Sequence, residues 1–317
     1  MFRSMLLSAI VPAAALIALL IGIIVLGGPA TPTPLDHIGA RFETVDWSGL
    51  SDPKTYDARD GEALAYRSYQ GDPAHVVLAL HGSGGAGRAL HPLASALNKA
   101  GATVIVPDIR GHGGSGRRGD VDYTGQVSDD LDDLRAVLAA EYPSARLTLL
   151  GFSMGGGLAL REAARAPADR LIMLSPYLAH DAPPMEAQNP FAPEHPWAVP
   201  GVPRLIGLSI LSGLGIETFS HLKVVNLATR PEDGDNVSPS YTHRMLTSVN
   251  PVDWQADFAT LSTPPVIFVG AEDELHYAPA YQDAAPGVDI RTLPDVDHMG
   301  LTLDASAIAA VVAEVMK

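Results

Sequence analysis

The segment "LTLLGFSMGGGLAL", Leu147 to Leu160, places a serine between a run of apolar residues and a run of helix-forming residues. Its first half is typical of a buried strand, and Met154 to Arg165 has the pattern of a helix. Ser153 therefore stands in a strand-to-helix turn, with Gly151 and Gly155 two positions to either side. Small residues there tolerate the close backbone approach that such a tight turn needs. The segment predicts a nucleophile raised above a sheet edge; the alternative is an ordinary serine at a helix N-cap.

Apolar runs alternate with helical segments over most of the chain. Short runs rich in Val, Ile and Leu predict strands at His75–Leu80, Ala102–Asp108, Arg146–Phe152, Arg170–Pro176, Pro264–Gly270 and Asp289–Pro294. Helical patterns fall at Ala89–Ala100, Thr124–Glu141, Met154–Arg165, Ala278–Ala285 and Ala305–Met316, the last with Asp304 as its N-cap. This alternation favours an α/β fold with an open, mostly parallel sheet covered by helices on both faces. Residues 40–47 and 62–70 are expected to form an antiparallel hairpin at the sheet edge.

The alternation stops between about residues 178 and 252. The stretch is rich in proline, then apolar from Leu205 to Leu214, then polar. Its apolar part is too short to cross a membrane. We expect an insertion that lies outside the sheet.

Charge and cysteine content exclude several classes of function. The formal net charge is −15, and no basic block stands out, which argues against a nucleic-acid partner. Cysteine is absent, so the chain has no disulfides, no thiolate metal ligands and no cysteine nucleophile.

The N-terminus is apolar and uncharged from Met5 to Gly28, which is long enough to span a bilayer as a helix. Arg3 precedes this segment, so we expect a single-pass anchor with the catalytic domain on the non-cytoplasmic side. The alternatives are a cleaved signal peptide, which would make the protein secreted, and a buried core helix. Residues 1–28 are thus expected to be the anchor, 29–40 an extended tether, and 41–317 the folded domain.

A serine nucleophile needs a base, and the base works best when a carboxylate orients it. Asp273 follows the predicted strand that ends at Gly270, and His298 follows the last predicted strand. The order Ser153, Asp273, His298 places all three at the carboxyl ends of strands, where open α/β sheets bind their ligands. These are the predicted catalytic residues.

The strand ending at Leu80 leads into the Gly-rich turn "HGSGG". A tight turn there can direct a backbone N–H group into the cleft, and we assign the oxyanion donors to the N–H groups of Ser83 and Met154. The alternative, a phosphate-binding loop, lacks a Walker lysine and the Rossmann spacing.

With these motifs in place, the chain resembles the α/β-hydrolase superfamily, and most closely its monoacylglycerol lipase, lysophospholipase and serine aminopeptidase branch. The matching segments are "LHGSGG", "VPDIRGHGGSG", "GFSMGGGLAL", "VGAEDEL" and "DHMGL". The resemblance implies an eight-stranded sheet, no cofactor and no metal, and a lid inserted after the sixth strand.

Function is predicted as serine ester hydrolysis through an acyl-enzyme, with a lipid-like ester such as a monoacylglycerol or lysophospholipid, or a short acyl ester, as substrate. A serine aminopeptidase or amidase and a non-catalytic, membrane-tethered binding protein remain as alternatives. For the lid, the hypothesis is an apolar cover over Ser153 that binds the acyl chain; the alternative is that the same residues only pack the lid on the core. The side chains concerned are Trp197, Leu205, Leu208, Leu211 and Phe219.

Overall fold

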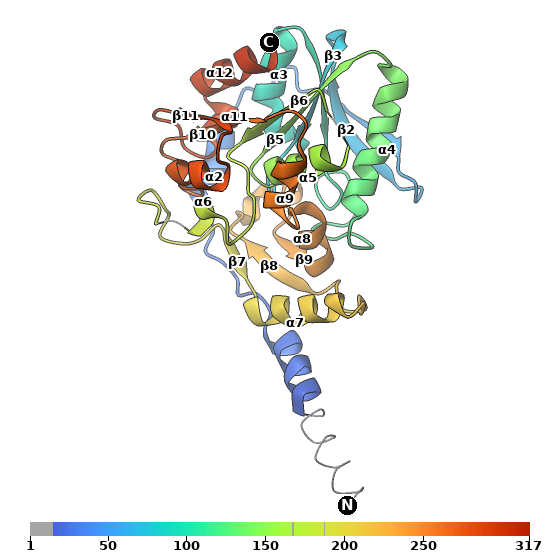
Figure 1. Ribbon diagram of the computed structural model, residues 1–317, viewed down its shortest axis with the longest axis vertical. Helices are drawn as coiled ribbons and strands as arrows, with labels where there is room; N and C mark the ends of the chain where they lie inside the picture. Colours follow the sequence, from blue (N-terminus) through green and yellow to red (C-terminus); the bar gives the residue numbers. More distant parts are fainter. Residues whose placement is uncertain (1–14, 167, 187) are drawn as a thin grey trace, which may run out of the picture.

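The computed structural model of the protein describes residues 15–166, 168–186 and 188–317, and an eight-stranded sheet runs through its centre (Figure 1). The order across the sheet is β1-β2-β4-β3-β5-β6-β10-β11. Among the described strands of this sheet, only the pairs β1-β2 and β2-β4 are antiparallel, which confirms the mostly parallel sheet and an antiparallel pair at its edge. The strands are β1 (Pro53–Asp57), β2 (Ala63–Tyr69), β3 (Asp72–Leu80), β4 (Ala102–Pro107), β5 (Arg146–Phe152), β6 (Arg170–Leu174), β10 (Val266–Gly270) and β11 (Asp289–Leu293).

Helices cover both faces of this sheet. Along β3, Val76 and Leu78 pack with α4 (Gln126–Glu141) and α5 (Met154–Arg165), whereas Val77 and Ala79 pack with α3 (His91–Lys99) and α12 (Ala305–Val315). Alternate strand residues point to opposite faces, so a strand that is apolar throughout buries both sides of the sheet. Short helices connect these elements: η2 (Gly87–Leu90), η4 (Ala278–Ala280), α10 (Tyr281–Ala284) and α11 (Gly300–Leu303).

The predicted hairpin has the wrong first strand. Residues 40–44 belong to helical turns, α2 (Asp36–Ala40) and η1 (Arg41–Thr44), residues 45–47 form no regular element, and β1 begins only at Pro53. The reason is the spacing of Leu35, Ile38 and Phe42, which recur at helical intervals and line one cavity together. Alternation within residues 40–47 alone does not reveal this spacing.

Asp304 stands at the N-cap position of α12, as predicted, but its carboxylate does not cap the described helix. It accepts a hydrogen bond from the Arg41 guanidinium at 2.8 Å instead. Arg41 also reaches Asp297 at 3.2 Å. These ion pairs hold η1 against the loop that carries His298.

The segment between β6 and β10 contributes no described strand to the main sheet. Its strands β7 (Ala198–Pro200), β8 (Lys223–Leu227) and β9 (Ser240–Thr242) form a separate antiparallel sheet. Its helices are α6 (Pro183–Glu186), α7 (Val202–Gly213), η3 (Pro231–Asn236), α8 (His243–Val249) and α9 (Trp254–Thr260). We call residues 175–262 the lid. It follows the sixth strand, as the resemblance implies.

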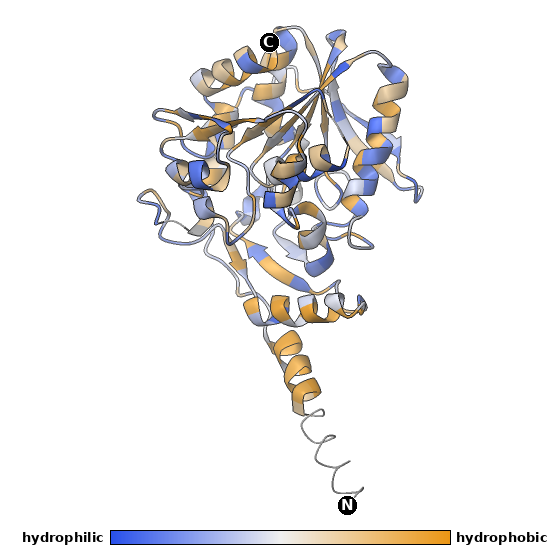
Figure 2. Cartoon of the chain, viewed as in Figure 1, coloured by the Kyte–Doolittle hydropathy of each residue, from blue (hydrophilic) through white to orange (hydrophobic). Residues whose placement is uncertain are grey.

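The predicted anchor is described only in part, because residues 1–14 lie outside the described residues. Residues 15–26 form an apolar helix that projects from the lid side of the molecule (Figures 1 and 2). Among the described residues, we find no helix of sufficient length and hydrophobicity to cross a membrane.

The predicted tether, residues 29–40, lies against the protein. The Asn226 side chain donates to the Ala30 carbonyl at 3.0 Å, and the Leu35 N–H donates to the Ala228 carbonyl at 2.9 Å. The tether is therefore docked along the lid, and it leads from the N-terminal helix to the wall of the cavity that Leu35, Ile38 and Phe42 line.

Candidate active site

Ser153 sits at the sharp turn between β5 and α5, with φ 53° and ψ −121°. This left-handed backbone is strained for a residue with a side chain. The turn is held by its own amide, which donates to the Leu174 carbonyl at 2.9 Å. The Ser153 side chain accepts no hydrogen bond from the described first turn of α5, so the serine does not act as a side-chain N-cap.

Positions 151 and 155, on either side of Ser153, have no room for a side chain and must be glycine. A Cβ atom added to Gly151 would lie 2.1 Å from the Gly155 carbonyl oxygen, and one added to Gly155 would lie 2.3 Å from the Leu80 carbonyl oxygen. Both distances are far below contact distance, so the turn excludes any side chain there. β5, α5 and the end of β3 approach each other this closely only because both positions are glycine.

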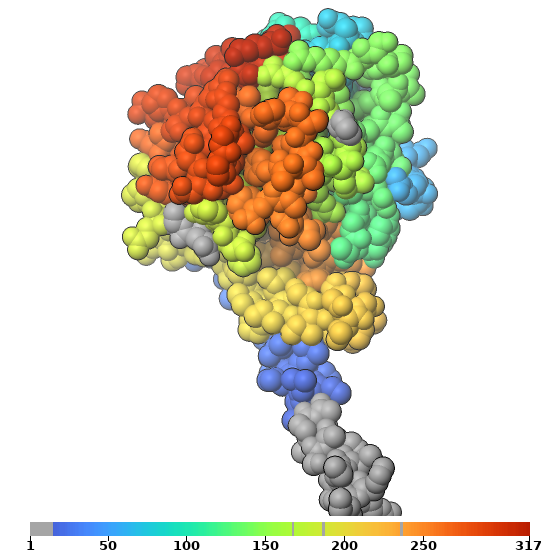
Figure 3. Space-filling model, in the orientation of Figure 1, coloured from blue at the N-terminus to red at the C-terminus, as the bar shows by residue number. Residues whose placement is uncertain are grey.

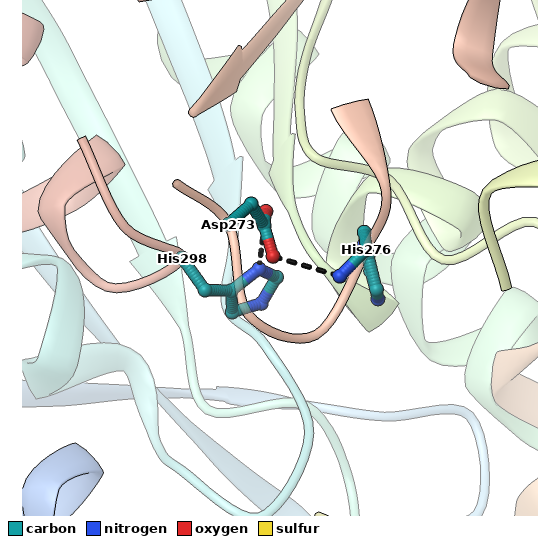
Figure 4. A group of neighbouring side chains, drawn as sticks. All are labelled: Asp273, His276 and His298. Atoms are coloured by element: carbon teal, nitrogen blue, oxygen red, sulfur yellow. Dashed lines mark hydrogen bonds and ion pairs between the residues drawn. The ribbon is translucent and has the colours of Figure 1, made fainter. Parts of the chain in front are cut away.

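Asp273 and His298 meet at the carboxyl ends of β10 and β11. His298 Nδ1 lies 2.8 Å from Asp273 Oδ2 (Figure 4), and both side chains are almost fully buried. The other carboxylate oxygen, Oδ1, accepts the backbone N–H groups of Leu275 and His276 at 2.9 and 2.8 Å. These bonds fix the orientation of the carboxylate, which in turn orients the imidazole.

The charges of this pair support each other. Burial disfavours the imidazolium form of His298, but the Asp273 carboxylate outweighs burial and raises the pKa of His298 above its ordinary value. Burial likewise opposes ionisation of Asp273, but the positive charge and hydrogen bond of His298 lower the pKa of Asp273. Since Nδ1 of His298 is bonded to a carboxylate, Nε2 is the nitrogen left to exchange a proton.

His276 is a buried neighbour that sequence reasoning missed. Its ring meets the His298 ring edge to face, with 4.7 Å between centroids (Figure 4). The Tyr281 hydroxyl donates to the Pro176 carbonyl at 2.7 Å, so it accepts from Nδ1 of His276 at 3.0 Å. Burial, followed by the charge of His298, lowers the pKa of His276 to about 3, which keeps the ring neutral. The interval Asp-x-x-His in "EDELH" was the only sequence signal for this contact.

Asp273, His276 and His298 offer ligand atoms within 4.8 Å of one another, which is the spacing of a metal site. Their hydrogen bonds do not fit that use. Both Asp273 oxygens, His298 Nδ1 and His276 Nδ1 already have partners. The set fits an oriented imidazole better than a metal centre.

The Gly-rich turn after β3 lies beside Ser153. Among the described residues, the backbone N–H groups of Ser83 and Met154 donate to no protein acceptor, which leaves them available for an oxyanion. Gly84 adopts φ 73°, and its N–H donates to the Tyr241 hydroxyl at 2.6 Å. Tyr241 belongs to β9, so a lid residue holds this turn in place.

Two buried histidines, His112 next to Tyr241 and His81 next to His112, support the same turn. His112 Nδ1 donates to the Ile109 carbonyl at 3.1 Å, so its Nε2 accepts from the Tyr241 hydroxyl at 2.7 Å. His81 donates from Nδ1 to the Gly82 carbonyl at 2.8 Å and accepts the Ile109 N–H at 3.1 Å. Burial lowers the pKa of both histidines. They are neutral supports for the turn.

Trp197 makes the second contact from the lid. Its indole N–H donates to the Ser83 hydroxyl at 2.9 Å, and its ring lines the cavity over Ser153. The other predicted lid residues are placed differently. Leu205, Leu208 and Leu211 pack with Ile24 of the N-terminal helix.

Phe219 is 45% exposed. None of Leu205, Leu208, Leu211 and Phe219 lines the cavity in the part of the chain that the structure describes. Their predicted role as a cover over Ser153 is therefore wrong. The reason is that the apolar surface of α7 faces the N-terminal helix and the outside of the molecule, a partnership that the lid sequence alone does not reveal.

A cavity of about 270 Å³ contains Ser153 and His298. The centroids of the Phe152 and His298 rings lie 4.9 Å apart, so Phe152 packs against the histidine at the cavity wall. One wall comes from residues ahead of β1, which sequence reasoning assigned to the tether and edge strand. These wall residues are Leu35, Ile38, Phe42 and Trp47.

Comparison with known proteins agrees with this architecture. The sequence profile of the serine aminopeptidase S33 family matches residues 71–289. A monoacylglycerol lipase of Mycolicibacterium smegmatis is 32% identical over 114 residues, covering 35% of this chain and 41% of the lipase. A proline iminopeptidase of Pestalotiopsis fici is 34% identical over 110 residues, covering 33% of this chain and 36% of the peptidase. These matches span less than half the length of either relative.

Solved structures show the same fold. A monoglyceride lipase of Saccharomyces cerevisiae superimposes with a TM-score of 0.63 at 16% identity, over 86% of this chain and 95% of that chain. An esterase of Exiguobacterium antarcticum superimposes with a TM-score of 0.56 at 21% identity, over 84% of this chain and 100% of that chain. Since the family match covers more than half of the sequence, the chain is an α/β-hydrolase of the serine aminopeptidase S33 family.

Proposed function

We propose that the protein is a serine hydrolase that cleaves carboxylic esters through an acyl-enzyme. The observation that carries this proposal is the buried Asp273–His298 pair at the wall of the cavity that also contains Ser153. Ser153 in its strained turn, the base and two available N–H groups together supply the parts that acyl transfer needs.

The reaction follows from these positions. Ser153 Oγ attacks the ester carbonyl carbon while its proton passes to Nε2 of His298, and Asp273 stabilises the imidazolium. The N–H groups of Ser83 and Met154 bind the oxyanion. His298 then protonates the alcohol as it leaves. Water attacks the acyl-enzyme with His298 as base, and the acid departs while Ser153 regains its proton.

Esters fit the cavity better than the free amino terminus of a peptide. An aminopeptidase must bind an ammonium group, and a carboxylate with no other cationic partner binds it most strongly. The cavity wall holds Glu43 and Asp233, and both are ion-paired with Arg230 at 2.7 and 2.8 Å. Most of the remaining wall is apolar, which favours an acyl chain. We therefore favour a lipid-like or medium-chain ester.

A panel of substrates tests this function. Rates on p-nitrophenyl esters of increasing acyl length, monoacylglycerols, lysophospholipids and aminoacyl amides are compared for the full chain. We expect longer acyl esters to be preferred to acetate and amides to be poor substrates. A protein that hydrolyses only acetyl esters would contradict the lipid-like substrate. One that also resists fluorophosphonate labelling would be the non-catalytic binding protein.

Tyr241→Phe is expected to lower kcat by about tenfold or more with little change in KM, because the hydroxyl holds the turn that presents the Ser83 N–H. Steady-state kinetics on a soluble ester measures this split. Tyr123→Phe, which removes an exposed hydroxyl that donates to Asp129 at 2.6 Å and makes no contact with the Gly-rich turn among the described residues, is the control. If Tyr241→Phe raises KM instead, the tyrosine shapes the substrate site and does not position the oxyanion donor.

Ile38→Trp is expected to shift the acyl-length preference toward short chains, because Ile38 lines the cavity from the segment ahead of β1. The ratio of kcat/KM for long against short p-nitrophenyl esters should fall by about tenfold or more. Ile38→Leu conserves the volume and should leave the ratio nearly unchanged. An unaltered ratio in Ile38→Trp would show that the acyl chain binds elsewhere.

We also propose that the apolar N-terminal segment attaches the protein to a membrane with the catalytic domain on the non-cytoplasmic side. Support comes from the uncharged run Met5–Gly28, the preceding Arg3 and the projection of the helix of residues 15–26 from the lid. Fractionation of the expressed full chain, with protease protection, tests both attachment and sidedness.

A further inference from the structure

The outward face of α7 is apolar except for Ser209. Val202, Ile206 and Ile210 are 49%, 52% and 48% exposed, at intervals of four residues that place them on one side of the helix, and Leu214 at its C-cap is 69% exposed. The opposite side buries Leu208 and Leu211. A helix on the surface of a soluble domain normally presents charged residues outward, and one that is apolar all round lies in a core or against lipid. The only charged residue of α7 is Arg204.

The helix of residues 15–26 continues this surface. Its exposed side chains are also apolar: Leu16, Ile17, Leu19, Ile21, Val25 and Leu26. Figure 3 shows α7 as a shelf along the end of the molecule from which this helix emerges, and Figure 2 shows apolar residues on both elements. The two helices thus expose one larger apolar region, which on a monomer marks an interaction surface.

Specific contacts hold α7 against the N-terminal helix. The Arg204 guanidinium donates to the carbonyls of Ile24 and Val25, at 2.6 and 2.9 Å, and so satisfies the C-terminal end of the N-terminal helix. A Cβ atom at Gly207 would lie 2.6 Å from the Ile24 side chain, so the helices touch at this glycine. Because of these contacts, α7 lies across the end of the N-terminal helix (Figure 1).

We propose that the outward face of α7 binds the lipid bilayer, lying at the headgroup boundary where the N-terminal segment enters the hydrocarbon. This inference rests on the membrane attachment proposed above. A segment that enters a bilayer brings an element lying across its end down to the bilayer surface. There, an apolar helix face is stabilised by burial among the acyl chains.

The lack of charge on the outward face of α7 determines which lipid headgroups it can bind. The protein carries a net charge of −15, and the exposed face of α7 has no cationic cluster. Attraction to anionic headgroups therefore contributes little, and burial of apolar side chains drives the contact. Zwitterionic phosphatidylcholine suffices, and added salt does not release α7 from it.

Site-specific fluorescence tests this contact in the full chain. Since the chain has no cysteine, Ile206→Cys, Ile210→Cys, Leu19→Cys and Val137→Cys each carry a single NBD label. Val137 is a matched exposed aliphatic residue on α4, away from α7 (Figure 1). Each variant is inserted into phosphatidylcholine nanodiscs at one copy per disc. Quenching by aqueous iodide is compared with quenching by doxyl groups on the lipid chains.

At positions 206 and 210, we expect iodide quenching severalfold weaker than at 137, together with strong quenching by shallow doxyl lipids. Protection at 19 with full iodide access at 206 and 210 overturns the proposal while the membrane attachment stands. Iodide access at 19, 206 and 210 overturns both. Protection of α7 only in discs that hold two copies assigns the face to a second copy of this chain and overturns lipid binding.

Discussion

Ser153→Ala is expected to lower kcat/KM for ester hydrolysis by at least about 10,000-fold and to abolish labelling by a fluorophosphonate. The hydroxyl is the only atom group removed, and the glycines and backbone bonds that form the turn are independent of it. Thermal unfolding of the variant should match that of the original protein. Alanine even keeps the backbone amide that binds the Leu174 carbonyl.

The control is Ser262→Ala, which removes an equivalent hydroxyl from an exposed loop ahead of β10. Activity and labelling should be unchanged in this variant. Persistent labelling of Ser153→Ala would mean that another nucleophile reacts. Loss of activity in both variants would point to a preparation that does not fold.

Asp273→Asn is expected to lower kcat by about 10,000-fold, because it reverses the tautomer of His298. The asparagine carbonyl oxygen can still accept the Leu275 and His276 N–H groups, so the fold of this loop should persist. Its NH₂ group then faces Nδ1 of His298 and donates to it. The ring proton moves to Nε2, and that nitrogen can no longer accept the proton of Ser153.

The same variant changes the pH profile. His298 must be neutral to act as a base, and the charge of Asp273 raises its pKa above 6.5, so kcat/KM should fall as the pH drops through a value above 6.5. Without the carboxylate, the residual activity should persist to lower pH. Asp297→Asn, the adjacent acid that binds Arg41 and the Gly300 N–H, should cause little change. An equal loss in both variants would show that Asp273 has no special role.

Local sequence patterns were sufficient to predict the structure where the residues that contact each other lie close together in the sequence. The Gly-x-Ser-x-Gly turn needs small residues at two fixed positions, and the contact distances at Gly151 and Gly155 show why. Buried strands of a parallel sheet are apolar on both faces, so β4 and β5 were located to within about two residues. The first hairpin strand was misplaced because residues 40–47 pack in a cavity wall that is formed by distant segments.

The sequence by itself determined the alternation of strands and helices from β3 to β6, the turn at Ser153, the pairing of Asp273 with His298 and the family. Each of these rests on local spacing or on motifs that keep their order along the chain. The tertiary structure alone decided that His276 packs on His298, that Tyr241 and Trp197 of the lid hold the Gly-rich turn, and that α7 faces outward beside the N-terminal helix. These contacts join segments whose relative placement follows from packing and hydrogen bonding across the whole fold, which no short stretch of sequence specifies.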